Sequence, residues 1–530
     1  MIKLLDCTLR DGGYINDWNF GAENIRYIAD KIVYAGVDVI EMGYLSVNNS
    51  ENPNATRYFS VDQVAFIASS IPLGRQDYAL MINYGEYPQE KLADASANSP
   101  ILRIAFHKKD LYAAMTYVSE SLKKGYRCYV QPMGVLNYSD AEFVDLILMV
   151  NTMNVEAFYI VDSFGILEMK DFRRLLFLAD HNLKENIFLG YHAHNNLQQA
   201  YDNAKYMCMQ PLTHNIVIDA SIFGMGRGAG NLNIELFAQY LNNTIGTRYN
   251  IEAFLEVFDK CLKPIYVKTP WGYSLPFYLS AIHNVHPNYA AYFSEKNTLN
   301  VKSLNELLGM IPKDEKNNFT KDKAASYYRK YLERFIDDEE GKIKLKKEII
   351  DKPILILAPG KTLRSYEDRI VSFIVEKKPV IIGVNRASSR FKYKYLFITN
   401  EKRLTDEKPN NVDIYIKTSN LPQIYDDTIM VNYSSYLLSE DCIADNPTLM
   451  LVNLLTSMGL TDINIAGFDG FSMKPDENYF DAGLSMGSSL QSKIERNEYI
   501  RDAVKMMRGK TKLNFITPSI YIENTENSDQ

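Results

Sequence analysis

The chain has 530 residues, of which 46% are hydrophobic and 23% charged, and its formal net charge is −7 at pH 7. This length predicts two or three domains, because a single hydrophobic core stops growing at about 250–300 residues. The mixed and mildly acidic charge excludes a disordered chain and offers no field that would attract nucleic acid or an anionic membrane.

Short β-rich runs alternate with amphipathic helical stretches over residues 1–245. Continuous apolar strands joined by helices are typical of a parallel sheet, and eight such units predict a closed (β/α)₈ TIM barrel. An open, doubly wound sheet is the alternative. The expected strands are Lys3–Thr8, Val37–Met42, Tyr78–Asn83, Ile101–Phe106, Arg127–Gln131, Ala157–Asp162, Ile187–His192 and Ile216–Ala220.

The pattern changes after the barrel. Residues 246–350 read as helices with aromatic loops, and we expect a helical lid or communication region and a linker there. Over residues 351–520 apolar runs such as ILILAPG and INIAGFDG again end in small or polar residues, which predicts a Rossmann-like α/β domain. This domain either binds a nucleotide or nucleotide sugar, with Asp469 as its candidate functional residue, or carries turn glycines without any ligand. Residues 521–530 are expected to be a disordered polar tail.

The barrel prediction places functional groups at the carboxyl ends of the strands. There the motif GYHAHNN spaces His192 and His194 two residues apart, so that both face the same side of a strand. Asp11, after the first strand, completes a set of two histidines and one carboxylate with open coordination positions. Such a site predicts a divalent cation that polarises a substrate carbonyl, and the ligand types leave Mn²⁺, Fe²⁺, Zn²⁺ and Mg²⁺ open.

Arg10 directly precedes this aspartate and would give an oxyanion beside the ion a fixed cationic donor. An ordinary Arg–Asp ion pair is the alternative. Gly12 and Gly13 follow, and we expect them to adopt backbone conformations that other residues avoid, turning the chain so that Arg10 and Asp11 point into the barrel mouth. An ordinary turn without a role in the site is the alternative.

Five motifs in this order, DCTLRDGGY, VIEMGY, VDSFG, GYHAHNN and IFGMGRGAGN, resemble the DRE-TIM metallolyase superfamily of HMG-CoA lyase-like proteins. The resemblance is strongest to its 4-hydroxy-2-oxovalerate aldolase branch and covers about residues 1–245. It implies that a divalent cation is held by Asp11, His192 and His194. Asn231 is implied as an additional metal ligand or as a contact to one.

The resemblance also implies roles for neighbouring residues. Arg10 would stabilise a pyruvate enolate, and Glu41 would orient Arg10 or a metal-bound water. The glycine-rich loop Gly224–Gly230 would close over the site.

Tyr14 departs from the pattern of the aldolase branch, which has a catalytic histidine at this place. Tyrosine has a reference pKa of about 10 and is therefore a poorer base at neutral pH. Tyr14 itself, Asp17, His283 or His286 would accept the proton, and a substrate other than that of the branch is open.

The implied activity is that of a metal-dependent carbon–carbon lyase or aldolase, cleaving or forming a bond next to a 2-oxo acid. Mn²⁺ is the favoured cofactor, with Mg²⁺, Zn²⁺ or Co²⁺ as alternatives. The implied partners are a small 2-oxo acid and an aldehyde, with a partner dehydrogenase or a homo-oligomer as the open assemblies. Nucleic-acid and membrane partners are not expected. Neither a signal sequence before Leu4 nor a spanning apolar run is evident, so we expect a cytoplasmic protein.

Residues of the C-terminal domain loosely resemble bacterial sialyltransferase-like or motility-accessory glycosyltransferase-like α/β domains. This resemblance implies a role in the biosynthesis of a surface-polysaccharide sugar. Two alternatives to the aldolase stay open: a Claisen-type acyl-CoA condensing enzyme, and a non-catalytic barrel that supports a nucleotide-sugar-binding domain.

Overall fold

The computed structural model describes residues 1–47, 52–296, 298–333, 336–404, 408–421, 428–472, 478–481 and 490–522. The chain forms two compact units, one of Met1–Ala291 with Lys313–Asn318 and one of Tyr292–Pro312 with Phe319–Gln530. The helical segment expected over 246–350 is therefore shared between the two units. The expected polar tail lies outside the described residues from position 523 onward.

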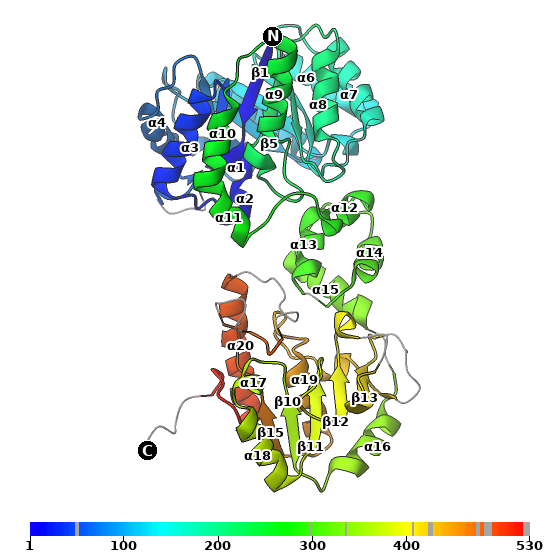
Figure 1. Cartoon of the computed structure of the whole chain (residues 1–530). Helices are drawn as coiled ribbons and strands as arrows, with labels where there is room; N and C mark the ends of the chain where they lie inside the picture. Colours follow the sequence, from blue (N-terminus) through cyan, green and yellow to red (C-terminus); the bar gives the residue numbers. More distant parts are fainter. Residues whose placement is uncertain are drawn as a thin grey trace. The chain divides into compact units, whose positions relative to one another are not determined.

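The first unit is a closed barrel of parallel strands inside a layer of helices (Figure 1). Its strand order is β1-β9-β8-β7-β6-β5-β4-β2, and the pairing of β1 with β2, with Leu5 opposite Val39, closes the ring. The predicted TIM barrel is confirmed, and the open sheet is wrong for this unit. The strands are β1 (Ile2–Asp6), β2 (Val39–Leu45), β4 (Asp77–Asn83), β5 (Ile101–Phe106), β6 (Cys128–Pro132), β7 (Ala157–Asp162), β8 (Phe188–Ala193) and β9 (Ile216–Ala220), with the two-residue β3 (Arg57–Tyr58) added beside β2.

Amphipathic helices cover the barrel because their apolar residues recur every three or four positions. In α3, for example, Ile25, Ile28 and Ile32 are buried against the strands. Capping boxes at Ser60 and Ser139 define the starts of α4 and α6. The helices between the strands and after β9 are α3 (Ala22–Tyr34), α4 (Val61–Ser69), α5 (Leu111–Lys123), α6 (Asp140–Asn151), α7 (Met169–Asn182), α8 (Ala200–Met209) and α9 (Ile234–Ile245).

The segment after α9 continues the wall of the barrel. Helix α10 (Ile251–Val257) packs against α3 and α9, and a π-helical turn over Phe258–Leu262 leads into α11 (Lys263–Lys268). Trp271 is buried in the barrel core, where its indole N–H donates to Phe223 O at 2.8 Å. Two further helices follow, α12 (Leu275–Ile282) and α13 (Pro287–Glu295).

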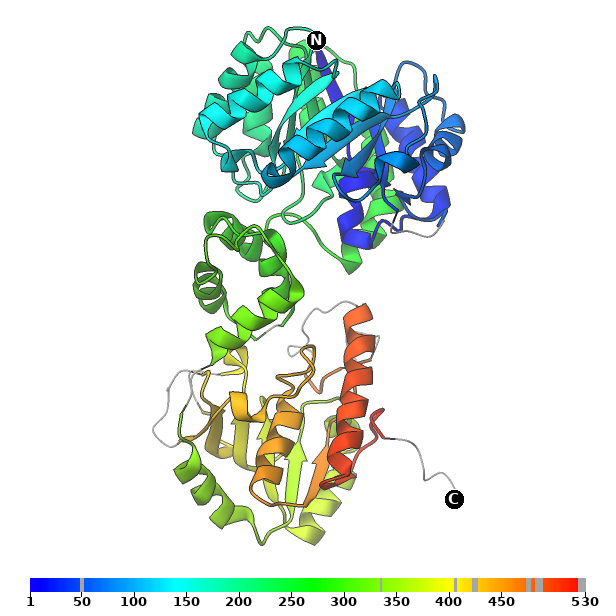
Figure 2. The same ribbon diagram turned by 180° about the vertical axis from the view of Figure 1, so that it is seen from behind.

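The second unit is built on a seven-stranded parallel sheet of order β14-β13-β12-β11-β10-β15-β16. Helices cover both faces: α18 (Glu367–Lys377) lies in front of the sheet in Figure 1, and α19 (Pro447–Ser457) lies in front of it in the reverse view of Figure 2. The predicted Rossmann-like α/β class agrees with this all-parallel sheet. The strands are β10 (Ile354–Leu357), β11 (Val380–Val384), β12 (Tyr393–Ile398), β13 (Val412–Thr418), β14 (Thr428–Val431), β15 (Asp462–Ala466) and β16 (Lys512–Phe515).

The sequence prediction missed only β16 in this sheet. That strand, KLNF, has a single buried residue, Leu513, and so lacks the apolar run that marks its neighbours. Among the described residues, every helix is too short or too polar to cross a membrane. The helices of the second unit are α14 (Val301–Gly309), α15 (Lys321–Leu332), α16 (Glu339–Ile349), α17 (Thr362–Ser365), α18 (Glu367–Lys377), α19 (Pro447–Ser457) and α20 (Leu490–Arg508).

Candidate metal and catalytic centre

Three side chains with metal-binding atoms meet at the carboxyl end of the barrel. Asp11 ends the short helix α1 (Thr8–Asp11) that follows β1, His192 lies in β8, and His194 comes directly after β8. All three are buried, and their ligand atoms lie within 4.8 Å of one another. His194 Nε2 lies 3.7 Å from Asp11 Oδ2. The structure thus brings together the three ligands expected from the sequence.

Several polar atoms of this centre are buried without a hydrogen-bond partner among the described residues: Asp11 Oδ2, His194 Nδ1 and Asn231 Oδ1. Asn231 pairs with His194 in an isolated β-bridge, and its amide nitrogen donates to Met225 O at 3.1 Å, which leaves the side-chain oxygen unused. Buried lone pairs without a partner are costly, and a divalent cation would satisfy them together. The donor set of Asp11, His192 and His194 therefore fits a divalent metal, and the Asn231 side-chain oxygen lies next to this set.

Gly226 leaves room for such an ion. A Cβ at this position would lie 3.0 Å from Asp11 Oδ2 and would collide with the side-chain amide of Asn231. Any larger residue would therefore fill the space between these two side chains.

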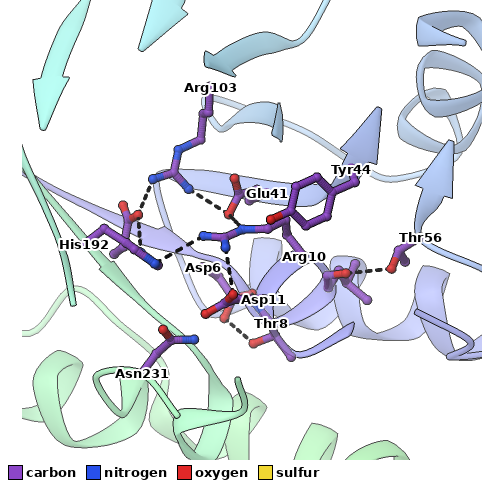
Figure 3. Close-up of polar contacts among 12 residues, drawn as sticks. Asp6, Thr8, Arg10, Asp11, Glu41, Tyr44, Thr56, Arg103, His192 and Asn231 are labelled. Carbon is purple, nitrogen blue, oxygen red and sulfur yellow. Dashed lines mark hydrogen bonds and ion pairs between the residues drawn. The ribbon is translucent and has the colours of Figure 1, made fainter. Parts of the chain in front are cut away.

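The guanidinium group of Arg10 lies at the middle of the centre (Figure 3). Its Nε donates to Glu41 Oε2 at 2.7 Å and its Nη1 to Asp11 Oδ1 at 2.8 Å, while Nη2 lies 3.5 Å from His192 Nε2. Burial works to lower the pKa of Arg10, but the carboxylates of Asp11 and Glu41 outweigh it and hold the pKa well above its usual value. Arg10 is therefore a fixed positive charge beside the metal ligands.

Arg103 and Asp219 extend this network, and sequence reasoning missed both. Arg103, on β5, is fully buried; its Nη1 lies 2.7 Å from Glu41 Oε2, and its Nη2 forms an ion pair with Asp219. Asp219 Oδ2 lies 2.9 Å from His192 Nδ1. A carboxylate on Nδ1 holds the imidazole with its Nε2 lone pair available, as ligating histidines require. The sequence feature that could have identified them is a charged residue inside an otherwise apolar strand: Arg103 in ILRIAF and Asp219 in IVIDA.

The protonation states suit metal binding. Burial works to raise the pKa of Asp11, but Arg10, His194 and His192 outweigh it, and the pKa lies far below its usual value. Burial lowers the pKa of His194 to about 3. A charged carboxylate and a neutral imidazole are the forms that bind divalent cations.

The two glycines after Asp11 have a different role from the expected one. Gly12 has helical angles (φ −59°, ψ −26°), Gly13 begins the short helix α2 (Gly13–Asn16), and neither has a positive φ. The expectation of an unusual backbone conformation is wrong. A Cβ on Gly12 would collide with Thr8 O, and one on Gly13 would collide with the indole ring of Trp18. Close packing therefore requires glycine at both places.

The centre opens into a pocket of about 390 Å³. Of the four candidate bases, Tyr14 and His286 line this pocket, whereas Asp17 is exposed and, like His283, is not part of the lining. The Tyr14 hydroxyl lies 2.9 Å from that of Tyr44, whose pKa is raised well above its usual value by burial.

His107 and Arg227 also line the pocket. His107 directly follows β5, where a polar residue at a strand end was the signal, and burial lowers its pKa. Arg227, in the glycine-rich loop, donates to Ser163 O at 3.4 Å and lies 5.2 Å from the ring of Tyr14. Gly226 and Arg227 thus place the loop Gly224–Gly230 against the centre.

Comparison with known proteins gives matches to the barrel half of the chain. Residues 1–259 match the HMGL-like family. A 4-hydroxy-2-oxovalerate aldolase of Geobacillus genomosp. 3 is 26% identical over 262 residues, which are 49% of this chain and 74% of that protein. The enzyme of the same name from Moorella thermoacetica is 24% identical over 268 residues, 50% of this chain and 77% of that protein. The solved structure of the HMG-CoA lyase from Brucella melitensis covers 49% of this chain and 98% of its own, with 13% identity and a TM-score of 0.39.

Proposed function

We propose that the barrel, whose residues 1–259 match the HMGL-like family, is a divalent-metal-dependent carbon–carbon lyase acting on a small 2-oxo acid, similar to the 4-hydroxy-2-oxovalerate aldolases. One observation carries the proposal: the buried Asp11, His192 and His194 cluster, with unsatisfied lone pairs, lies beside the charged Arg10 at the base of an open pocket. Mn²⁺ is the favoured ion, and Mg²⁺, Zn²⁺ or Co²⁺ suit the same donors.

The cation supplies Lewis acidity toward a substrate carbonyl oxygen. Arg10 donates to the oxyanion that develops as the bond next to the 2-oxo group breaks, and its charge is maintained by Asp11 and Glu41. Arg103 and Asp219 hold Glu41 and His192 in place and touch no substrate. Arg227 is placed to pair with a substrate carboxylate, because it lines the same pocket.

In the cleavage direction, a base takes the proton of the 4-hydroxyl group and the C3–C4 bond breaks. An aldehyde leaves, and C3 of the pyruvate enolate then takes up a proton. We assign the base to Tyr14, in line with the sequence expectation. His286 is less suited, because its Nδ1 accepts from the Asn288 N–H at 3.2 Å, so the neutral ring carries its proton on Nε2.

The test is hydrogen–deuterium exchange at the methyl group of pyruvate, measured by NMR in D₂O with Mn²⁺, Mg²⁺, Zn²⁺ or Co²⁺. We expect metal-dependent exchange by the wild type and none by His192→Ala. Asp17→Asn is the matched control, because Asp17 is exposed and outside the pocket. Absence of wild-type exchange with pyruvate and 2-oxobutanoate under all four metals overturns the proposal.

Two other outcomes correspond to the alternatives. Release of free thiol from acetyl-CoA in the presence of a 2-oxo acid would identify a Claisen-type condensing enzyme. Failure to retain any metal after purification would favour a non-catalytic barrel. The aldehyde, a partner dehydrogenase and a role in surface-polysaccharide synthesis stay predictions from the sequence.

A further inference from the structure

A second pocket lies entirely within the second unit, at the carboxyl edge of its sheet, and has a volume of about 170 Å³. Pro359 follows β10, Asn385 and Arg386 follow β11, and Thr399 follows β12. Strand order reverses at β10, which has β11 on one side and β15 on the other. In open parallel sheets, ligands bind at the carboxyl ends of the strands near such a reversal.

Cationic side chains dominate the lining of this pocket. The lining includes five cationic residues and only one carboxylate, that of Asp445. Burial lowers the pKa of Arg403 and of Lys296, and a neighbouring cation adds to the effect in each case. Like charges held together in a partly buried site repel one another unless an anion joins them. The five cations are Lys296, Arg386, Arg403, Lys493 and Arg496.

Of the five cations, Lys493 gives the strongest evidence for a bound anion. It lies on α20 with only 9% of its surface exposed, and within the described part of the chain it has neither an ion pair nor a hydrogen bond. Arg496, one turn further along α20, has a buried Nε without a partner among the described residues. Lysine and arginine are rarely buried unless they are paired, and within the described part of the chain these two groups lack a counter-ion, which an anionic ligand would supply.

Other lining groups suit an organic ligand. The positive end of α19 faces the pocket at Pro447, and Asn446 caps this helix by accepting from the Leu449 N–H at 3.1 Å. Side-chain amides and aromatic rings complete the wall with groups that can contact hydroxyls and ring faces. These are Asn385, Asn400, Asn478, Phe471 and Tyr479.

We propose that this pocket binds a phosphorylated organic ligand, with Lys493, Arg403 and Arg496 contacting its phosphate oxygens. Arginine and lysine are the residues that proteins use for phosphate groups, and the excess of cations matches the charge of one or two phosphates. A nucleotide and a sugar phosphate share this chemistry. The proposal is independent of the activity of the barrel, since all lining residues belong to the second unit.

Asp469, the candidate functional residue of this domain, supports the pocket without lining it. It accepts a hydrogen bond from the Thr362 N–H at 2.8 Å and pairs with the hydroxyl of the same residue. A Cβ on Gly360 would lie 2.6 Å from its Oδ2. Asp469 is therefore a positioning residue that holds the turn between β10 and α17.

Isothermal titration calorimetry with the full chain tests the proposal. The probes are CMP, UDP, GDP, ADP, glucose 1-phosphate and inorganic phosphate at up to millimolar concentration. We expect at least one organic phosphate to bind, and Lys493→Met to weaken it by about tenfold or more, since a hydrogen bond to a charged group is lost. Lys505→Met, an exposed position on the same helix, should leave binding unchanged.

The thermal stability of the ligand-free protein gives a second readout. Because Lys493 has no partner in the described chain, Lys493→Met should leave the Tm unchanged or raise it, whereas loss of a structural ion pair would lower it. A response to nucleotides or to glucose 1-phosphate would each support the proposal and identify the source. Three results would overturn it: no binding of any probe, equal binding by Lys493→Met and wild type, or inorganic phosphate binding as tightly as the organic phosphates.

Discussion

The two pockets of this protein have opposite electrostatic deficits. In the barrel centre, the guanidinium groups of Arg10 and Arg103 are shared among three carboxylates, those of Asp11, Glu41 and Asp219, and the atoms left without a hydrogen-bond partner among the described residues include the oxygens Asp11 Oδ2, Glu41 Oε1 and Asn231 Oδ1. The pocket of the second unit is lined by five cations and one carboxylate, and within the described part of the chain Lys493 forms no ion pair or hydrogen bond and Arg496 Nε has no hydrogen-bond partner. One site lacks a cation and the other lacks an anion. Unsatisfied buried groups thus identify the charge of a ligand more sharply than the shape of a pocket does.

The largest expected effect comes from removing the charge of the barrel site's carboxylate ligand. Asp11→Asn keeps the size of the side chain but removes the anion, and the remaining imidazoles should no longer retain a divalent ion. We expect the metal content, measured by plasma mass spectrometry, to fall to near zero and the pyruvate exchange rate to fall by about a thousandfold or more. Asp17→Asn should match the wild type in both measurements. Full metal occupancy in Asp11→Asn would contradict the assignment of Asp11 as a ligand.

The free energy of unfolding should respond differently to the loss of a cation from each of the two sites. Arg103→Met leaves Glu41 and Asp219 as buried carboxylates with fewer partners and should lower the free energy of unfolding by about 3–5 kcal/mol. Lys493→Met removes a charge that has no partner in the described chain and should cost nothing.

Both tryptophans, Trp18 and Trp271, are in the barrel unit, so urea unfolding followed by their fluorescence reports on Arg103→Met. Calorimetry of the whole chain reports on Lys493→Met. Equal losses of stability in both variants would remove the distinction between a paired and an unpaired charge.

The base of the barrel site can be assigned by comparing three lining residues. Tyr14→Phe removes only a hydroxyl and should lower the exchange rate by about a hundredfold, within the usual contribution of a general base. Tyr44→Phe should have a smaller effect, because Tyr44 touches the reaction only through Tyr14. His107→Gln should have little effect. A larger loss in His107→Gln than in Tyr14→Phe would move the role to His107, and a metal content unchanged in all three would show that only the chemistry was altered.

The parts of this structure that sequence could predict are those set by local patterns. The strands β5 and β7 agree with the expected bounds, because a polar residue marks the end of each: His107 directly follows β5, and Asp162 is the last residue of β7. The first strand is shorter than expected, since Asp6 accepts hydrogen bonds from both the N–H and the hydroxyl of Thr8 and the chain enters α1 there. Strand β16 has too few apolar residues to be recognised locally.

Within the site, the residues next to strand ends could be found, and the residues that support them could not. Arg103 and Asp219 are 116 positions apart and meet only because the barrel closes. A charged residue inside an apolar strand indicates that it has a buried partner, but the sequence does not show which residue that partner is. The need for glycine at positions 12 and 13 likewise comes from tertiary contacts. A side chain there would collide with neighbouring atoms, which include the ring of Trp18, folded back onto α2.

The smallest expected effect concerns His286, which burial keeps neutral in the folded barrel. Its pKa is lowered from 6.5 to about 3, first by burial and then by Arg227, with His107 and His194 adding to the effect. The unfolded chain therefore binds a proton at this histidine between pH 6.5 and 3 that the folded chain does not bind. Lowering the pH through this window favours the unfolded state, so stability rises with pH there.

Between pH 7 and pH 5.5, the free energy of unfolding of the wild type should fall by about 1 kcal/mol more than that of His286→Gln, as the ordinary histidine pKa of about 6.5 requires. Urea unfolding of the metal-free protein by tryptophan fluorescence measures this difference. Because the protein is metal-free, competition between protons and the metal does not contribute to the measured free energy of unfolding. His194 and His107 are present in both proteins, so their own titration contributes equally to both curves and drops out of the difference. Parallel curves for the two proteins would mean that His286 is protonated in the fold, and that the cationic Arg227 does not exclude a second positive charge from the barrel pocket. The site would then tolerate unpaired cations as the second unit does, and the contrast between the two pockets would be one of degree.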